Sequence, residues 1–260
     1  MEPYQDYAAI YAAIGQEAFA EALVARLLAA LPNPPRRALD LACGTGAAAL
    51  ALARAGSTVV GVDRSPHMLA IAAARARDAR LPVFFIEADL RTLPIGTPTN
   101  GATAPLNLRP ASFDLITCLY DSLNYLTGNH DLALALTGAA RLLAPGGRLI
   151  FDLNTEYEFM TWDESDQVVH DAGGILVFNR LNYDHNTRLA SGRIVWFVRD
   201  DERWWRGEEQ HNERAWHDTE VLAALNAAGL TLLARRTPRW ALAAPDATRV
   251  VYDVTTSAAR

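Results

Sequence analysis

Residues 37–63 read RALDLACGTGAAALALARAGSTVVGVD, and this stretch decides the expected fold. A short apolar run that contains Asp40 is followed by a glycine turn at residues 43–46. An alanine- and leucine-rich stretch, which is a strong helix former, then leads to a β-branched run that ends at Asp63. This order predicts strand, tight turn, helix and strand, which together make one βαβ unit with a nucleotide-type fingerprint.

The glycine turn and the acid after the second predicted strand indicate a ligand site. Gly44 and Gly46 allow positive φ and close approach of the backbone to a ligand. Amides at the start of the following helix favour a polar or anionic group. Asp63 lies near the spacing at which an acid meets ribose hydroxyls in dinucleotide-binding units. The same glycines satisfy a nicotinamide fingerprint, so an NAD-dependent oxidoreductase on a related fold is one alternative.

The amino-acid sequences of three segments resemble motifs of the class I S-adenosylmethionine (SAM)-dependent methyltransferases. LDLACGTG places an acid just before the turn, as motif I of that family does. VVGVDRSPHML at residues 59–69 is similar to the second motif, and LLAPGGRLIFD at 142–152 is a string common in the family. The resemblance covers most of the chain except residues 155–210, where the family itself varies. It implies an α/β fold with a doubly wound, seven-stranded, mainly parallel sheet and SAM as the cofactor.

The resemblance also implies which residues hold the cofactor. Asp63 would bind the ribose, Asp89 would accept a hydrogen bond from the adenine amine, and Met68 would lie near the adenine. In the family an N-terminal segment with a tyrosine often folds over SAM, and YQDYAAIY at residues 4–11 is similar to it; a helix packed on the domain surface is the alternative. The expected cofactor-binding residues are Tyr11, Asp40, Ala42, Gly44, Gly46, Asp63, Arg64, Met68, Asp89, Leu90 and Leu119.

Polar residues after the fourth predicted strand would face the reacting methyl group, because ligands of doubly wound sheets bind at the carboxyl ends of strands. Methyl transfer from a sulfonium needs no protein nucleophile, and orientation alone supplies up to about 7–11 kcal/mol. An amine acceptor must arrive unprotonated, and a nearby acid or histidine would take its proton. We therefore expect Tyr120, Asp121 and His211 as catalytic residues and Asn124 and Arg214 as substrate-binding residues.

The resemblance is strongest to small-molecule methyltransferases, such as the glycine, sarcosine and aminosugar N-methyltransferases. The Asn-Pro-Pro-Tyr string of enzymes that methylate nucleic-acid amines is absent, since residues 118–121 read CLYD. The expected acceptor is therefore a small molecule with an amine or a hydroxyl. A non-catalytic SAM-binding or partner-binding protein is the other alternative, because methyl transfer demands no universal catalytic residue.

Residues 156–213 differ in character from the rest of the chain. Three segments in this region read as β-strands of an antiparallel meander inserted after the fifth strand, namely 175–181, 193–198 and 203–210. We expect a methyltransferase domain from residues 1–155 and 214–260, and a β insertion from 156–213 that is a lid or a homodimer face and that governs the acceptor. All six tryptophans follow position 160, and they would form the core of the small sheet or, for one or two, line a substrate pocket.

Composition limits the remaining functions. The net charge of −6 and the pI of about 5.5 disfavour a large nucleic-acid interface. No run approaches the roughly 20 apolar residues of a membrane span, and no signal peptide is visible, so we expect a cytoplasmic protein without a membrane partner. Six histidines and two cysteines without metal-type spacing predict no metal site.

Overall fold

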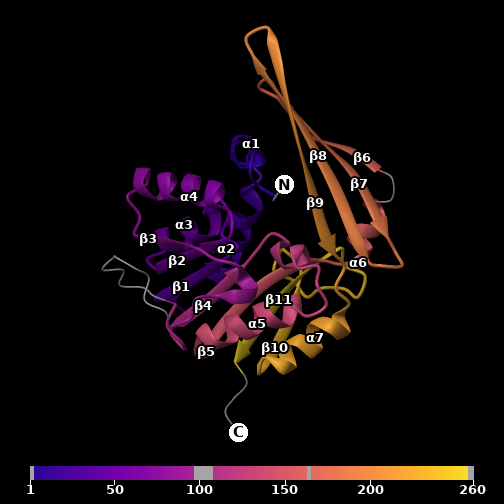
Figure 1. Ribbon diagram of the computed structural model, residues 1–260. Helices are drawn as coiled ribbons and strands as arrows, with labels where there is room; N and C mark the ends of the chain where they lie inside the picture. Colours follow the sequence, from indigo (N-terminus) through magenta and orange to yellow (C-terminus); the bar gives the residue numbers. More distant parts are fainter. Residues whose placement is uncertain (1–2, 97–107, 163–164, 257–260) are drawn as a thin grey trace.

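The main sheet has seven strands in the order β10-β11-β5-β4-β1-β2-β3 (Figure 1). The computed structural model describes residues 3–96, 108–162 and 165–256. Neighbouring strands from β3 to β5 are parallel, whereas β11 runs antiparallel to both β5 and β10. The doubly wound, mainly parallel sheet predicted from the sequence is thus confirmed. Its strands are β1 (Arg37–Leu41), β2 (Thr58–Asp63), β3 (Val83–Glu87), β4 (Phe113–Cys118), β5 (Leu143–Asn154), β10 (Leu230–Arg236) and β11 (Arg249–Thr256).

Helices cover both faces of this sheet because each has an apolar side to bury. The helix that follows the glycine turn is apolar almost all round, and six of its eight residues are buried, packing against the sheet and the helix at Ala18–Ala30. Ser65 caps the next helix by accepting from the Met68 amide at 3.2 Å, and Pro66 stands at its first position. The helices are α1 (Tyr7–Ala13), α2 (Ala18–Ala30), α3 (Ala47–Arg54), α4 (Pro66–Asp78), α5 (Asp131–Leu142), α6 (Glu156–Phe159) and α7 (Asp218–Ala227), with the short 3₁₀ turns η1 (Leu90–Thr92), η2 (Ser122–Tyr125) and η3 (Met160–Trp162).

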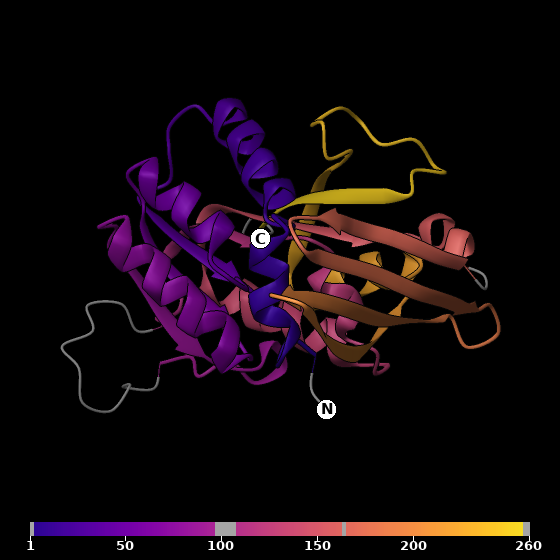
Figure 2. The ribbon, with the colours of Figure 1, turned by 90° about the horizontal axis from the view of Figure 1, so that it is seen from above.

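The N-terminal region forms two helices joined at a bend of 61°. Gly15, with a φ of 71°, lies in the connection between them. Among the described residues no single helix is long and apolar enough to cross a membrane, and α1 and α2 meet that criterion only when they are counted together. Viewed from above, α1 lies between α4 and the second sheet (Figure 2).

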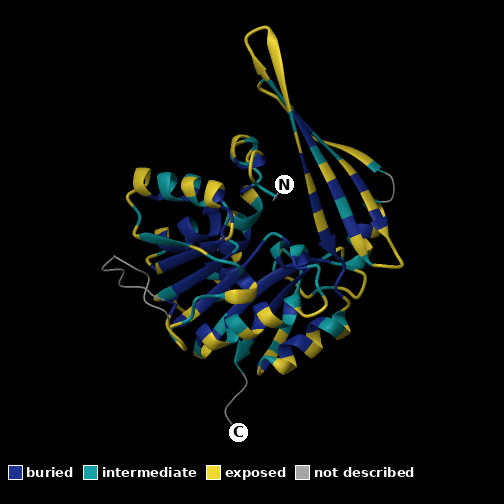
Figure 3. Ribbon diagram, viewed as in Figure 1, coloured by how far each residue is buried: buried dark blue, intermediate teal, exposed yellow. Residues whose placement is uncertain are grey.

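The insertion forms a second, antiparallel sheet in the order β6-β7-β8-β9. Its strands are β6 (Ser165–Ala172), β7 (Ile175–Asp184), β8 (Leu189–Asp200) and β9 (Arg203–Arg214). The sequence did not indicate β6, because its residues are mostly polar and exposed. Exposed and buried residues alternate along β9 from Glu208 to Glu213, and the tip of the β8–β9 hairpin is exposed (Figure 3).

The buried face of the second sheet packs against α1. Tyr7 contacts Trp196 at a ring-centroid distance of 5.3 Å, and Val177 completes this small core. Gly207 lies opposite Trp196, and a Cβ there would come within 2.2 Å of the indole ring, so the glycine provides the space for the tryptophan. α1 and the insertion therefore form one packed unit, although they are about 170 residues apart in sequence.

Candidate functional site

The glycine turn between β1 and α3 adopts a conformation that few side chains tolerate. Ala42, Gly44 and Gly46 have φ values of 51°, 53° and 85°. Asp63, at the tip of β2, fixes the turn because its Oδ2 accepts from the Gly44 amide at 2.8 Å, while its Oδ1 accepts from the Ser65 amide at 2.8 Å. A Cβ on Gly44 would meet no protein atom within 4 Å, so that side of the turn is open.

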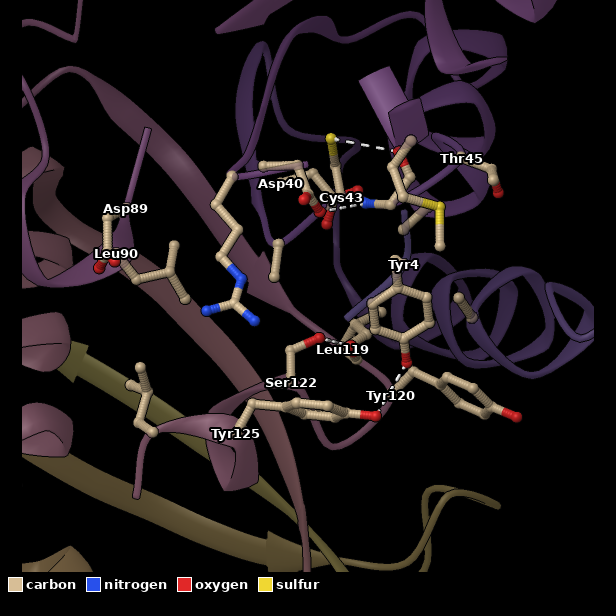
Figure 4. Close-up of a pocket in the computed structure, with 18 of the residues that line it drawn as sticks. Tyr4, Asp40, Cys43, Thr45, Asp89, Leu90, Leu119, Tyr120, Ser122 and Tyr125 are labelled. Atoms are coloured by element: carbon tan, nitrogen blue, oxygen red, sulfur yellow. Dashed lines mark hydrogen bonds between the residues drawn. The ribbon is translucent and has the colours of Figure 1, made fainter. Parts of the chain in front are cut away.

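A cavity of about 280 Å³ lies at the carboxyl ends of β1, β2 and β4 (Figure 4). The structure brings ten of the eleven predicted cofactor residues to its wall: Tyr11, Asp40, Ala42, Gly44, Asp63, Arg64, Met68, Asp89, Leu90 and Leu119. Gly46 does not line it; a Cβ there would approach Ala72 Cβ to 3.1 Å, so packing as well as φ restricts this position. None of the six tryptophans lines this cavity; Trp196 and Trp216 are buried in other clusters, while Trp204 and Trp205 are exposed.

Asp40 lines this cavity, and one of its carboxylate oxygens is buried without a hydrogen-bond partner in the described part of the chain. Its Oδ1 accepts from Thr117 Oγ1 at 2.7 Å, whereas its Oδ2 is buried without a hydrogen-bond partner among the described residues. Burial raises the pKa of Asp40 to about 7. A buried acceptor left without a partner is costly, so this oxygen is suited to a cationic donor that enters the cavity.

Acidic residues outnumber basic ones around the cavity. Its lining contains four aspartates, including Asp131, and two arginines, Arg64 and Arg91. Arg91 Nε donates to Asp89 Oδ1 at 2.9 Å, and this bond lowers the pKa of Asp89. Arg91 Nη1 also donates to Asp131 Oδ2 at 3.3 Å. The sequence interpretation included Asp89 and missed Arg91. The remaining excess of negative charge favours a ligand with positive charge.

The turn after β4 is strained and held by a buried ion cluster. Tyr120 and Asp121 have consecutive positive φ values of 63° and 50°, which are uncommon for residues other than glycine. Asp152 accepts from both of their amides, at 2.7 and 3.0 Å, and Arg249 Nη1 donates to Asp152 at 2.6 Å and to Asp121 at 2.8 Å. This arrangement places Tyr120 in the cavity wall. It holds Asp121 within the ion cluster, so this predicted catalytic residue does not line the cavity.

Two predicted substrate residues have structural contacts instead. Asn124 is fully buried, and its amide group donates to the carbonyls of Asn154 and Arg214 while accepting from the Asn154 amide. The Arg214 guanidinium stacks on Trp216 at 4.2 Å and donates to Asn129 Oδ1 at 2.7 Å. Neither residue lines the cavity, because these contacts use their polar groups to join β5, β9 and the η2 region.

Tyr4 and Tyr125 supply part of the cavity wall that the sequence interpretation missed. Tyr4 has a φ of 63°, and it is fixed on both sides: its amide donates to Glu209 at 2.7 Å and its carbonyl accepts from Ser65 Oγ at 3.0 Å. The Tyr4 and Tyr125 hydroxyls lie 3.0 Å apart (Figure 4). His211 lies behind them, outside the lining, with Nδ1 2.8 Å from the Tyr125 hydroxyl.

Comparisons with known proteins agree with this geometry. Residues 38–147 match the model of a family described as "Methyltransferase domain". A protein from Geobacillus sp. (strain WCH70) whose name describes it as a methyltransferase is 30% identical over 205 residues, which are 76% of this chain and 75% of that one. A SAM-dependent methyltransferase from Clostridium acetobutylicum has a TM-score of 0.80 and 25% identity, covering 99% of this chain and all of that one. The chain belongs to the class I SAM-dependent methyltransferases.

The same fold occurs in the SAM-bound amino pentose methyltransferase CalS10 from Micromonospora echinaspora, with a TM-score of 0.70 and 23% identity over 99% of both chains. SAM is the cofactor of this methyltransferase, and two features of the cavity fit it. The open side of Gly44 leaves room for a ligand against the backbone, and the unpartnered Asp40 oxygen suits an ammonium group. The resemblance recognised in the sequence is thus confirmed.

Proposed function

We propose that this methyltransferase transfers the methyl group of SAM to the nitrogen of a small-molecule amine. One observation carries the choice of nitrogen: the described lining combines four aspartates against two arginines with tyrosine rings, among them Tyr4, Tyr120 and Tyr125, which suits an acceptor that arrives as a cation. Burial raises the pKa of Tyr120 to about 12, so this phenol is no base at neutral pH. A hydroxyl acceptor needs a strong base in contact with it, whereas a neutral amine brings its own lone pair.

The charges of the cavity support the same proposal. The excess of aspartates attracts an ammonium ion from water, and the tyrosine faces stabilise cationic groups that lie over them. An amine acceptor therefore gains affinity from the wall in its charged form. The lining has more acidic than basic residues, which disfavours contact with a nucleic-acid backbone and supports a small molecule as the acceptor.

We assign the cofactor contacts as follows. Asp63 binds the ribose hydroxyls with the lone pairs that its two backbone hydrogen bonds leave free, and Asp40 Oδ2 accepts from the ammonium group of SAM. Met68, Asp89 and Leu90 surround the adenine, while Ala42, Gly44 and Leu119 provide close backbone or apolar contact. Arg64 and Tyr11 complete the wall, Tyr11 facing the carboxylate of SAM.

When bound, SAM would supply the methyl group on a sulfonium, which is a good leaving group for displacement by an amine. Tyr120 and Tyr4 orient the acceptor nitrogen and exclude water from it, which is the main contribution that such a displacement requires of a protein. The strained turn at Tyr120 is held rigid by Asp152 and Arg249, so the orientation of the tyrosine is fixed before the acceptor binds.

We propose the domain division expected from the sequence, with residues 1–155 and 214–260 binding SAM and residues 156–213 governing the acceptor. The β9 residues Glu209 and His211 support the tyrosines of the cavity wall, which favours a covering role for the insertion. Sedimentation tests the alternative that the insertion is a homodimer face. A dimer that loses its insertion, becomes monomeric and keeps transfer activity would contradict the covering role.

Turnover with matched pairs of amines and alcohols tests the proposed function. Each pair has the same carbon skeleton, and S-adenosylhomocysteine is quantified by mass spectrometry. We expect methylation of amines and no methylation of the matching alcohols. Methylation of an alcohol whose matching amine is inert would overturn the choice of nitrogen. If neither the amines nor the alcohols are methylated, SAM binding, measured by calorimetry with NAD as the comparison, would be the only function left.

A further inference from the structure

Four side chains form a continuous hydrogen-bonded chain from the cavity to the interior of the second sheet. The Tyr4 hydroxyl lies 3.0 Å from the Tyr125 hydroxyl, which lies 2.8 Å from His211 Nδ1. His211 Nε2 lies 3.2 Å from Glu209 Oε2. The first two members line the cavity, and the His211 and Glu209 side chains are only 3% and 1% exposed.

Glu209 is ionised and can only accept hydrogen bonds. Its carboxylate accepts from the amides of Tyr4, Asp6 and Tyr7 at 2.7, 2.7 and 2.9 Å. Although burial opposes the charge, these bonds and the one from His211 hold the pKa of Glu209 below its usual value. A buried carboxylate with this many donors remains charged across the neutral pH range.

The acceptor at one end sets the direction of every hydrogen bond. Because Glu209 only accepts, Nε2 of neutral His211 carries the proton and Nδ1 is an acceptor. Tyr125 therefore donates to Nδ1, and Tyr4 donates to Tyr125. The oxygens of the two tyrosines consequently present only lone pairs to the cavity, so this part of the wall accepts hydrogen bonds and donates none.

We propose that Tyr4, Tyr125, His211 and Glu209 form a proton relay that converts the ammonium form of the acceptor into a neutral amine. The proposal rests on the N-methylation proposed above and adds how the acceptor loses its proton. Tyr4 is the residue that touches the acceptor nitrogen, Tyr125 and His211 pass the proton inward, and Glu209 is a positioning residue that also stabilises the imidazolium.

Each proton in this step has a defined destination. An N–H bond of the ammonium breaks as its proton passes to the Tyr4 oxygen, the Tyr4 proton passes to Tyr125, and the Tyr125 proton forms an N–H bond at His211 Nδ1. The nitrogen keeps the electron pair, with which it attacks the methyl carbon. Both phenols end neutral, and the imidazolium returns its proton to water by the reverse path when the methylated product leaves.

The surroundings favour a relay through neutral phenols over a phenolate. Burial raises the pKa of both Tyr4 and Tyr125 well above the usual value, so neither stays ionised. The groups that face the chain are Tyr7 of α1, whose ring lies 6.2 Å from the imidazole, and the carboxyls of Asp121 and Glu213, which act on both tyrosines. The positive charge on the sulfonium of SAM opposes a second cation at the acceptor nitrogen, which favours loss of the ammonium proton.

The test compares Tyr125→Phe with wild type on two acceptors, an aliphatic primary amine and a weakly basic aromatic amine that is neutral at pH 7. With the aliphatic amine we expect kcat to fall about 100-fold at pH 7, at the low end of the usual effect of a general base. The loss should shrink as the pH rises toward 9.5, because the amine then loses its proton to water. With the aromatic amine the variant should stay within about threefold of wild type.

Tyr7→Phe is the matched control, since it removes the hydroxyl of a buried tyrosine whose ring lies 6.2 Å from the imidazole and which is no member of the hydrogen-bonded chain. Its pH profile should match wild type. An equal loss on both amines at every pH, or an unchanged profile in Tyr125→Phe, would overturn the relay while leaving N-methylation intact; wild type that methylates no amine would overturn the proposed function itself. Nitrogen-15 NMR of the His211 ring gives a separate readout, and a proton on Nδ1 of the neutral ring would also overturn the relay.

Discussion

Lowering the pH should weaken SAM binding through Asp40. Its pKa is raised to about 7 by burial, and the ammonium of SAM would pair with its unpartnered Oδ2. If pairing returns the bound-state pKa to the ordinary value of about 3.9, only the ionised free carboxylate binds. The ionised fraction of Asp40 in the SAM-free protein falls from about one half at pH 7 to about 3% at pH 5.5. The affinity for SAM should therefore fall about 15-fold, which corresponds to about 1.6 kcal/mol.

Calorimetric titration of SAM at pH 7.0 and pH 5.5 measures this ratio. The amino group of SAM stays mainly protonated in this range, since α-amino groups have a pKa of about 7.7–8.0. Burial also raises the pKa of Asp63, which adds its own pH dependence. Asp40→Asn separates the two contributions, because the amide has the same shape and does not titrate. An affinity ratio as large in Asp40→Asn as in wild type would refute the assignment of the ammonium to Asp40.

The same shift has the opposite sign for the protein without SAM. Because the folded-state pKa of Asp40 lies above the unfolded value, the folded state binds more protons between about pH 4 and pH 7. The free energy of unfolding should therefore decrease as the pH rises through this window. Urea unfolding at pH 5 and pH 7 checks this, and Asp40→Asn should show a smaller decrease; an equal decrease would count against the raised pKa.

Three further substitutions have matched controls within the chain. Gly44→Val should abolish SAM binding in calorimetry with an unchanged circular dichroism spectrum, whereas Gly15→Val, which also has positive φ but lies outside the cavity, should bind SAM normally. Gly207→Ala should lower stability by about 1–3 kcal/mol in urea unfolding, because its Cβ would lie 2.2 Å from Trp196, while Gly192→Ala, at 3.3 Å from Leu181, should cost less. Arg249→Met should cost about 3–5 kcal/mol by leaving Asp152 buried and unpaired, whereas Arg180→Met, which breaks an exposed pair with Asp166, should leave the melting temperature unchanged.

The sheet and the cofactor end of the cavity could be predicted because their signals are local. The glycine turn, the acid at the tip of β2 and the apolar runs each lie within a few residues of the structure that they specify. Asp63 is the clearest case, since its position after β2 and its contact with the Gly44 amide follow from one βαβ unit. Polar β6 was missed because an exposed edge strand has no apolar alternation to recognise.

The part of the cavity that we propose for the acceptor could not be predicted, because its contacts join distant segments. Asp152 and Arg249 are 97 residues apart, and the Tyr4 amide reaches Glu209 across 205 residues. No pattern in either segment indicates its partner, so Asn124 was read as a substrate residue when it in fact joins strand β5 to the end of β9. Tyr4 lies in the segment that the sequence indicated, but which of its tyrosines reaches the cavity depends on tertiary contacts.

The contacts of Glu209 also change how the insertion must be understood. The sequence suggested that residues 156–213 govern the acceptor independently of the cofactor. Glu209 lies in that insertion, yet it accepts from three amides of the N-terminal segment, whose Tyr4 and Tyr11 line the cavity. The N-terminal segment, which we propose covers the cofactor, and the tyrosines that we propose face the acceptor are therefore held by the same carboxylate. Because a buried carboxylate loses all of these hydrogen bonds together, displacement of β9 would release the cover and the relay in one step.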